Sequence, residues 1–288
     1  MANLRDLRQR ITSVGNIEKI TRAMEMVATT KLRRFQDKAV AAKPYTGDIE
    51  DLVRRLAGAV AADPAAAGDA APLFAAGAAG TPRAILFVGS DRGLCGAYNS
   101  NIQRRLEEHL AGLEQPFTLY VIGRKAMEHA ERCGHPVAAY LEDQPLEKVS
   151  FASAAAVSAV LVGAFRAGEV SAVDLCFTRF LSMMRYEPVV EPFLPILAPA
   201  AAADAETILE PGGPEVLGRL IPKFLETAVY HALLESITSE YASRRFAMSN
   251  ATDAAGEMKK EITRTFNKVR QQKITSEILE IVSGAEAL

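Results

Sequence analysis

The stretch Leu4–Val27, LRDLRQRITSVGNIEKITRAMEMV, decides how this chain folds. Its apolar residues recur at alternating spacings of three and four, the near-heptad period of a helix that pairs with another helix. These positions are Leu4, Leu7, Ile11, Val14, Ile17, Ile20, Met24 and Val27. No proline precedes Pro44, so we expect a helix over residues 1–56 with a coiled-coil seam along it.

The carboxy-terminal part of the chain has the same character. No proline follows Pro222, and glycine occurs after it only at positions 256 and 284. A helix from Pro222 to about Val282 would be roughly 90 Å long, which favours coiled-coil pairing over burial in a small domain. Apolar residues at helical spacing include Met258, Ile262, Phe266, Val269, Ile274, Ile278 and Ile281. We therefore expect the two terminal helices to pair, with Ile11 and Ile262 buried between them.

The middle of the chain alternates β-rich apolar runs with helical patterns, which is typical of an α/β sheet domain. The expected strands are Arg83–Val88, Phe117–Ile122, Val137–Tyr140, Ala172–Phe180 and the edge strand Val189–Leu194. The expected helices are Asn99–Leu110, Arg124–Arg132 and Phe151–Ala167. The sequence thus predicts terminal helices at 1–56 and 215–288, linkers at 57–82 and 198–214, and an α/β domain at 83–197.

Composition narrows the class of protein. The 288 residues carry a net charge of −2, which offers no overall attraction to nucleic acid. The three cysteines are far apart without a CxxC pair, so we expect a reducing compartment and no disulfide framework. The charged amino terminus predicts no targeting peptide. Residues 1–56 nevertheless hold twelve basic against seven acidic side chains, which indicates a partner for this helix besides the other helix.

Two constellations invite a chemical function. The loop Gly89–Gly96 follows a predicted strand, where phosphate-binding loops occur, but it lacks the GK[ST] ending and the GxGxxG spacing. We interpret it as a structural turn, with a nucleotide-dependent α/β enzyme as the alternative. His129, Cys133 and His135 lack the usual two-plus-two spacing of metal ligands, so we assign no metal and no other cofactor. A free-standing coiled-coil adaptor is the second alternative.

Several short sequence motifs together resemble those of one family. These motifs are Ile11–Val14, Lys19–Ala28, Ser90–Gly96, Tyr241–Arg244, Met248–Thr252, Asn267–Thr275 and Glu280–Gly284. In this order, over nearly the whole chain, they resemble the gamma subunit of the rotary, F-type ATP synthase. Gly15 lies inside the expected first helix, where glycine costs about 1 kcal/mol relative to alanine. The charged Glu286 and the absence of the chloroplast form's cysteine-bearing insertion depart from the family.

The resemblance implies a rotating central shaft without an active site of its own. The terminal helices would form an antiparallel coiled coil inside the ring of alpha and beta subunits, with the Rossmann-like α/β domain inserted between them near epsilon and the membrane c-ring. The chain would lie peripherally at the cytoplasmic face of the bacterial plasma (inner) membrane. The resemblance implies partner contacts at Lys19, Arg22, Met24, Arg244, Gln271, Thr275 and Glu277.

Overall fold

The computed structural model describes residues 4–62, 64–75, 77–78, 80–141, 143–196 and 213–286. The chain divides into two compact units, one formed by residues 1–30 and 244–288 and the other by residues 31–243. The expected linker at 198–214 lies almost entirely outside the described residues. Within the described residues no helix is both long and apolar enough to cross a membrane.

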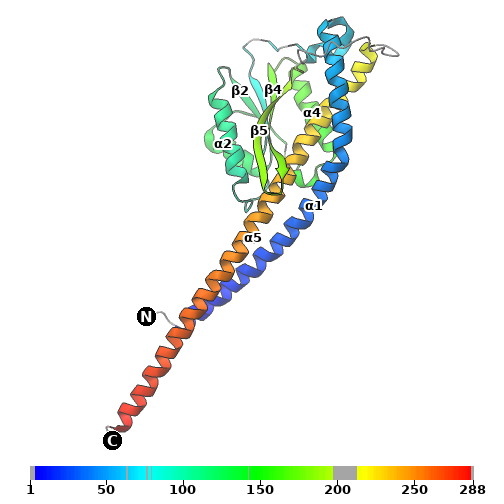
Figure 1. Cartoon of the computed structure of the whole chain (residues 1–288). Coiled ribbons are helices and arrows are strands. Elements are labelled where there is room, and N and C mark those ends of the chain that lie inside the picture. The colour runs from blue at the N-terminus through cyan, green and yellow to red at the C-terminus, as the bar shows by residue number, and fades with distance from the viewer. Residues whose placement is uncertain are drawn as a thin grey trace. The chain divides into compact units, whose positions relative to one another are not determined.

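Two very long helices and an α/β sheet make up the fold, as the sequence predicts (Figure 1). The helices are α1 (Leu4–Ala62), α2 (Tyr98–Ala111), α3 (Arg124–Cys133), α4 (Phe151–Arg166) and α5 (Gly213–Glu286), with 3-10 segments η1 (Pro64–Leu73) and η2 (Leu146–Lys148). The strands are β1 (Arg83–Val88), β2 (Phe117–Ile122), β3 (Val137–Tyr140), β4 (Ala172–Ser182) and β5 (Arg185–Leu194). The first three strands have the predicted bounds.

The sheet unit has the strand order β3-β2-β1-β4-β5. The first four strands are parallel, and β5 pairs antiparallel with β4 at one edge. Alternate residues of β1, Ile85 and Phe87, pack with Ile102 and Leu106 of α2 in one continuous apolar cluster. The intervening residues of β1 are also fully buried, as expected for a parallel sheet covered on both faces.

Parts of both long helices belong to the sheet unit. Residues 31–62 and 213–243 belong to the same compact unit as the sheet. Residues 57–62 were expected in a linker, but α1 continues through them to Ala62. Lys31 of α1 forms an ion pair with Glu147 of η2 at 3.0 Å, and Tyr241 of α5 donates a hydrogen bond to the same carboxylate. The ring of Phe35 stacks on Tyr241 with centroids 5.7 Å apart. These contacts join three separate segments of chain within this unit.

The other unit is an antiparallel helix pair. Glu18 contacts Lys259 and Thr21 contacts Thr252, so the residue numbers rise along α1 as they fall along α5. Buried and half-buried residues alternate at spacings of four and three along both helices, which is a coiled-coil seam. In α1 they are Leu7, Ile11, Val14, Glu18, Thr21, Glu25 and Ala28, and in α5 they are Met248, Thr252, Ala255, Lys259, Ile262, Phe266 and Val269.

The seam in α1 differs from the predicted one beyond Val14. Ile17, Ile20 and Val27 were expected in it, but they are 52%, 59% and 55% exposed. The observed heptad continues one residue later, through Glu18, Thr21 and Glu25, and the polar groups of Glu18 and Thr21 find partners on α5. Ile11 and Ile262, expected to be buried, are half-buried, since each helix of a pair covers the other on one side only.

Candidate functional site

An apolar stripe lies on the outer surface of α1 in the helix-pair unit. Ile17, Ile20 and Val27 are spaced by three and seven residues, so they lie on one helix face, and we call them the outer stripe. Each of these side chains is more than half exposed. Half-buried Met24 lies on the same line, while Lys19 and Arg22 are exposed on other faces of the same turns of α1. An exposed apolar row is typical of a protein-binding surface.

The carboxy-terminal end of α5 has a second exposed apolar row. Every residue from 271 to 283 is exposed, and Ile274, Ile278 and Ile281 follow one another at helical spacing with 47%, 55% and 71% exposure. The contact register places the start of α1 opposite the last half-buried seam residue, Val269. The end of α5 therefore runs past α1 (Figure 1), and an exposed apolar row of this kind is typical of a binding surface.

The polar residues expected to contact partners divide into two groups. Gln271, Thr275 and Glu277 are exposed on this end of α5. The Thr275 hydroxyl donates to the Gln271 carbonyl at 2.9 Å, and Glu277 lies 3.6 Å from Lys273 on its own helix. Arg244, in contrast, is only 7% exposed. The structure therefore leaves three of these four side chains exposed and buries the fourth.

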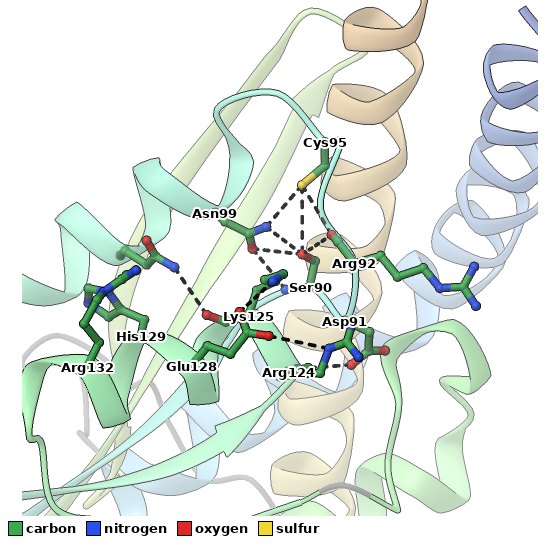
Figure 2. A network of polar contacts seen from close by, with 11 residues as sticks. Ser90, Asp91, Arg92, Cys95, Asn99, Arg124, Lys125, Glu128, His129 and Arg132 are labelled. Carbon is green, nitrogen blue, oxygen red and sulfur yellow. Dashed lines mark hydrogen bonds and ion pairs between the residues drawn. The ribbon is translucent and has the colours of Figure 1, made fainter. Parts of the chain in front are cut away.

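The loop 89–96 in the sheet unit turns Ser90 and Cys95 inward toward Asn99 of α2, while the Arg92 side chain points away from them (Figure 2). The Ser90 hydroxyl donates to the carbonyl of Arg92 at 2.8 Å and accepts from the amide of Asn99 at 2.7 Å, while the backbone amide of Ser90 donates to the Asn99 carbonyl oxygen. The Asn99 amide also lies 3.2 Å from the sulfur of Cys95. These contacts hold the turn between β1 and α2 and bind the side chains of Ser90, Cys95 and Asn99 to one another.

The loop glycine Gly89 serves close packing. A Cβ atom on Gly89 would lie 2.8 Å from the Cβ of Ala126, and one on Gly123 would lie 2.2 Å from the carbonyl oxygen of Gly89. Gly123 also has a φ of 93°, which favours glycine. The glycines therefore let the start of α3 approach the end of β1, where Lys125 donates to the carbonyl of Ser90.

Helix α5 occupies the place where doubly wound sheets bind nucleotides. That place is the crevice at the carboxyl ends of β1 and β4, where the strand order reverses. Here Ser243 of α5 donates to the carbonyl of Cys95 at 2.6 Å, and Ser239 donates to the carbonyl of Thr178 at 3.3 Å. The amide of Thr178 donates to the hydroxyl of Ser236. In this Rossmann-like sheet, the edge that usually binds a ligand therefore binds helix α5 of the same chain.

Comparisons with known proteins agree with this arrangement. The family model described as ATP synthase matches residues 3–288. The chain is 40% identical over 289 residues to the ATP synthase gamma chain of Moorella thermoacetica, and 38% identical over 293 residues to that of Dehalococcoides mccartyi strain CBDB1, each over the full length of both proteins. This chain belongs to the ATP synthase gamma-chain family.

A solved structure shares the gamma-chain fold. In the rotor of the Euglena gracilis mitochondrial ATP synthase, in rotational state 1, one chain matches with a TM-score of 0.62 and 17% identity. The match covers 94% of this chain and 98% of that one. The long antiparallel helices with an inserted α/β unit are thus the gamma-chain fold, as the sequence analysis expects.

Sequence reasoning missed two features of this gamma-family chain. It assigned the outer stripe to the seam, because an apolar period alone does not distinguish two adjacent helix faces. It also set His129, Cys133 and His135 aside, although the structure brings them together with Glu107 of α2. The fourth member of that cluster, Glu107, lies 22 residues before His129 in the sequence. Only the packing of α2 against α3 brings its carboxylate to the histidines.

Proposed function

We propose that this chain is the central rotating shaft of an ATP synthase, coupling transmembrane proton flow to ATP synthesis in a ring of alpha and beta subunits. The observation that carries the proposal is the exposed apolar surface of the helix pair. Apolar rows that remain outside the seam of a coiled coil need a surrounding partner. A ring enclosing the shaft provides one on every side.

The charge of the amino-terminal helix supports the same partner. Lys19 and Arg22 are exposed on the same turns of α1 as the outer stripe, on other faces of the helix, so an acidic segment of a beta subunit would be attracted to this part of the helix. A shaft shifts the catalytic subunits only if its contacts with them differ from one rotational state to the next. The outer stripe is on one side of the pair, and the exposed row of α5 is at its end, which gives the shaft unlike faces.

The chain acts without catalysing the reaction. Its loop 89–96 is engaged with Asn99 and with α5, which supports a structural role, and the nucleotide chemistry belongs to the ring. We place the epsilon subunit and the membrane c-ring as further partners of the sheet unit. The chain then lies peripherally at the cytoplasmic face of a bacterial plasma (inner) membrane.

Assembly with the ring tests the proposal. The chain is co-expressed with the alpha and beta subunits of its own synthase, and the complex is purified through a tag on beta. Changing Ile17, Ile20 and Val27 together to Ser should weaken retention of the chain at least tenfold, because burying their exposed parts contributes on the order of 2–4 kcal/mol.

Two controls make the result decisive. Val40→Ser changes a side chain of α1 that is 72% exposed but lies in the other unit, so it should leave retention unchanged. Circular dichroism checks that the triple variant keeps its helix content. A folded triple variant that is retained like the wild type would remove the outer stripe from the ring contact and contradict the shaft proposal.

A further inference from the structure

Four side chains with metal-binding atoms meet between α2 and α3. Glu107 comes from α2, His129 and Cys133 come from α3, and His135 follows the end of α3. One ligand atom from each lies within 4.8 Å of every other. We propose that this cluster, here called the 107–135 site, binds one divalent transition-metal ion of the zinc class.

Local backbone structure aims the ligands at one point. His129 and Cys133 are four residues apart, so they share a face of α3. Gly134 then takes a left-handed φ of 70°, and the amide of His135 donates back to the carbonyl of Ala130 at 3.0 Å. This turn is a common way to end a helix. It brings the imidazole of His135 to the same side as His129.

Both imidazoles converge on a single oxygen atom. Nε2 of His129 lies 2.7 Å and Nε2 of His135 lies 2.8 Å from Oε1 of Glu107. Aromatic contacts fix the rings, since His129 packs edge-on against Phe87 and His135 against Phe117. The two histidine side chains are mostly buried. Two nitrogen donors are therefore held in place before any ligand arrives, which lowers the cost of binding.

The chemistry of the donors selects the metal. Two imidazoles, one thiolate and one carboxylate make an N2SO set, which suits a four-coordinate zinc ion. Calcium and magnesium prefer oxygen ligands throughout. Of the three free cysteines, Cys133 is the exposed one, so its side chain has room to turn toward the site. Its present distance to Nε2 of His129 is 3.8 Å.

One adjustment is required on binding. The oxygen and the nitrogens now lie closer together than the spacing of about 3.3 Å between ligand atoms in a tetrahedral zinc site. Glu107 is 41% exposed, so its carboxylate can move outward by the difference. On metal binding the Cys133 thiol gives its proton to solvent, and each neutral imidazole that coordinates through Nε2 carries its proton on Nδ1 instead, so binding releases one proton.

Arg132 contacts His129 in a way that competes with metal binding, so replacing it gives a further test of the site. Its guanidinium lies 3.1 Å from Nδ1 of His129, and Figure 2 shows the two side chains next to each other. Because arginine only donates hydrogen bonds, Nδ1 accepts and the proton of His129 is on Nε2. Coordination through Nε2 moves that proton to Nδ1 and breaks the contact with Arg132. Removing the guanidinium should therefore strengthen metal binding.

The test is a titration of the full chain with Co²⁺, followed by competition with Zn²⁺. We expect saturation at one ion per chain, with the near-ultraviolet charge-transfer band of a cobalt–thiolate bond and displacement by Zn²⁺. Cys133→Ser should abolish that band and weaken Zn²⁺ binding at least tenfold, and His135→Gln should weaken it similarly. Arg132→Ala should strengthen binding roughly tenfold, in the range found for groups that contact metal ligands.

The control variant is His231→Gln, which removes a histidine of α5 outside the cluster and should bind like the wild type. Zn²⁺ should also raise the melting temperature of the wild type but not that of Cys133→Ser. Absence of saturable 1:1 binding, or an unchanged cobalt band in Cys133→Ser, would overturn the proposal. A loss of affinity in Arg132→Ala would overturn the ligand arrangement through Nε2 of His129.

Discussion

The ammonium group of Lys259 lies 3.1 Å from the carboxylate of Glu18 across the helix pair. The Lys259 hydrogen bond and charge hold the pKa of Glu18 below its usual range. Next to this ion pair, the hydroxyl of Thr252 donates to that of Thr21 at 2.8 Å. Polar contacts in a coiled-coil seam fix the register of the two helices at a cost in stability. In this part of the pair, matched polar side chains therefore determine the register more than apolar burial does.

Breaking this ion pair should loosen the helix pair locally. Glu18→Gln removes the charge that Lys259 faces, so amide hydrogen exchange near residues 14–21 should become faster, while exchange in the sheet unit stays unchanged. Hydrogen exchange read by mass spectrometry checks this. Glu257→Gln, an exposed carboxylate of α5, is the matched control. Equal exchange in wild type and Glu18→Gln would mean that the contact does not hold the pair.

Gly15→Ala should stabilise the helix pair. A Cβ at this position would meet only the Lys259 side chain, at an ordinary contact distance of 3.7 Å. Replacing a helix-interior glycine by alanine should therefore gain about 0.5–1 kcal/mol in the free energy of unfolding. Gly89→Ala should instead lose about 1–3 kcal/mol, because its Cβ would overlap Ala126. Urea unfolding measures both changes, and a loss for Gly15→Ala would contradict the packing described.

Glu147 should make the sheet unit sensitive to acid. Partial burial raises its pKa, but the hydrogen bond from Tyr241 and the contact with Lys31 outweigh burial and lower the pKa. A lowered pKa in the folded state gives stability that is present above the unfolded pKa of about 4.3 and is lost as the pH falls through the folded value. Because the group is partly exposed, the contribution should be below about 1 kcal/mol.

The measurement for Glu147 is urea unfolding between pH 3 and 7, with roughly one-unit steps around the usual carboxyl pKa. The stability difference between wild type and Glu147→Gln should be largest above pH ~5 and should shrink below it. Glu187→Gln, a carboxylate of β5, serves as a comparison. A difference that grows as the pH falls would reverse the sign of the argument.

Met24→Lys should impair coupling more than assembly. Met24 is half-buried, and Lys19 and Arg22 are exposed on the same part of α1, so an added cation would bind an acidic partner more tightly in some rotational states than in others. ATP-driven proton pumping relative to ATP hydrolysis should therefore fall in reconstituted membranes, while the complex yield stays normal. Met24→Leu is the conservative control. A wild-type ratio in a fully assembled Met24→Lys enzyme would place Met24 outside the moving contact.

The isolated chain should show no saturable binding of MgATP in calorimetry. Its loop lacks the phosphate-binding lysine and hydroxyl, and the crevice behind the loop holds Ser243 of α5. Gly93→Val is a suitable probe, because a Cβ there would meet nothing within 4 Å, so the variant should fold. If the wild type bound MgATP at micromolar concentration and Gly93→Val abolished that binding, the result would favour the alternative of a nucleotide-dependent enzyme.

Much of the fold could be predicted from the sequence, because short-range sequence patterns determine where most helices and strands lie. β1, β2 and β3 were predicted with their observed bounds, because β-rich apolar runs bordered by proline, glycine or polar residues leave few alternatives. The edge position of β5 followed from its prolines, which cannot donate to a second neighbouring strand. The two long helices followed from the absence of proline and the helical period. The family resemblance likewise rests on motifs whose residues are contiguous in sequence.

The tertiary structure alone decided which surfaces meet. The seam of α1 passes through Glu18 and Thr21 instead of Ile17 and Ile20, because Lys259 and Thr252 on the opposite helix satisfy the polar groups. Glu107 reaches His129 and His135 because α2 packs beside α3 on the sheet. Hydrophobic period and spacing act within one segment, whereas pairing depends on atoms that lie far apart in sequence, and those atoms determine which apolar side chains stay free for a partner.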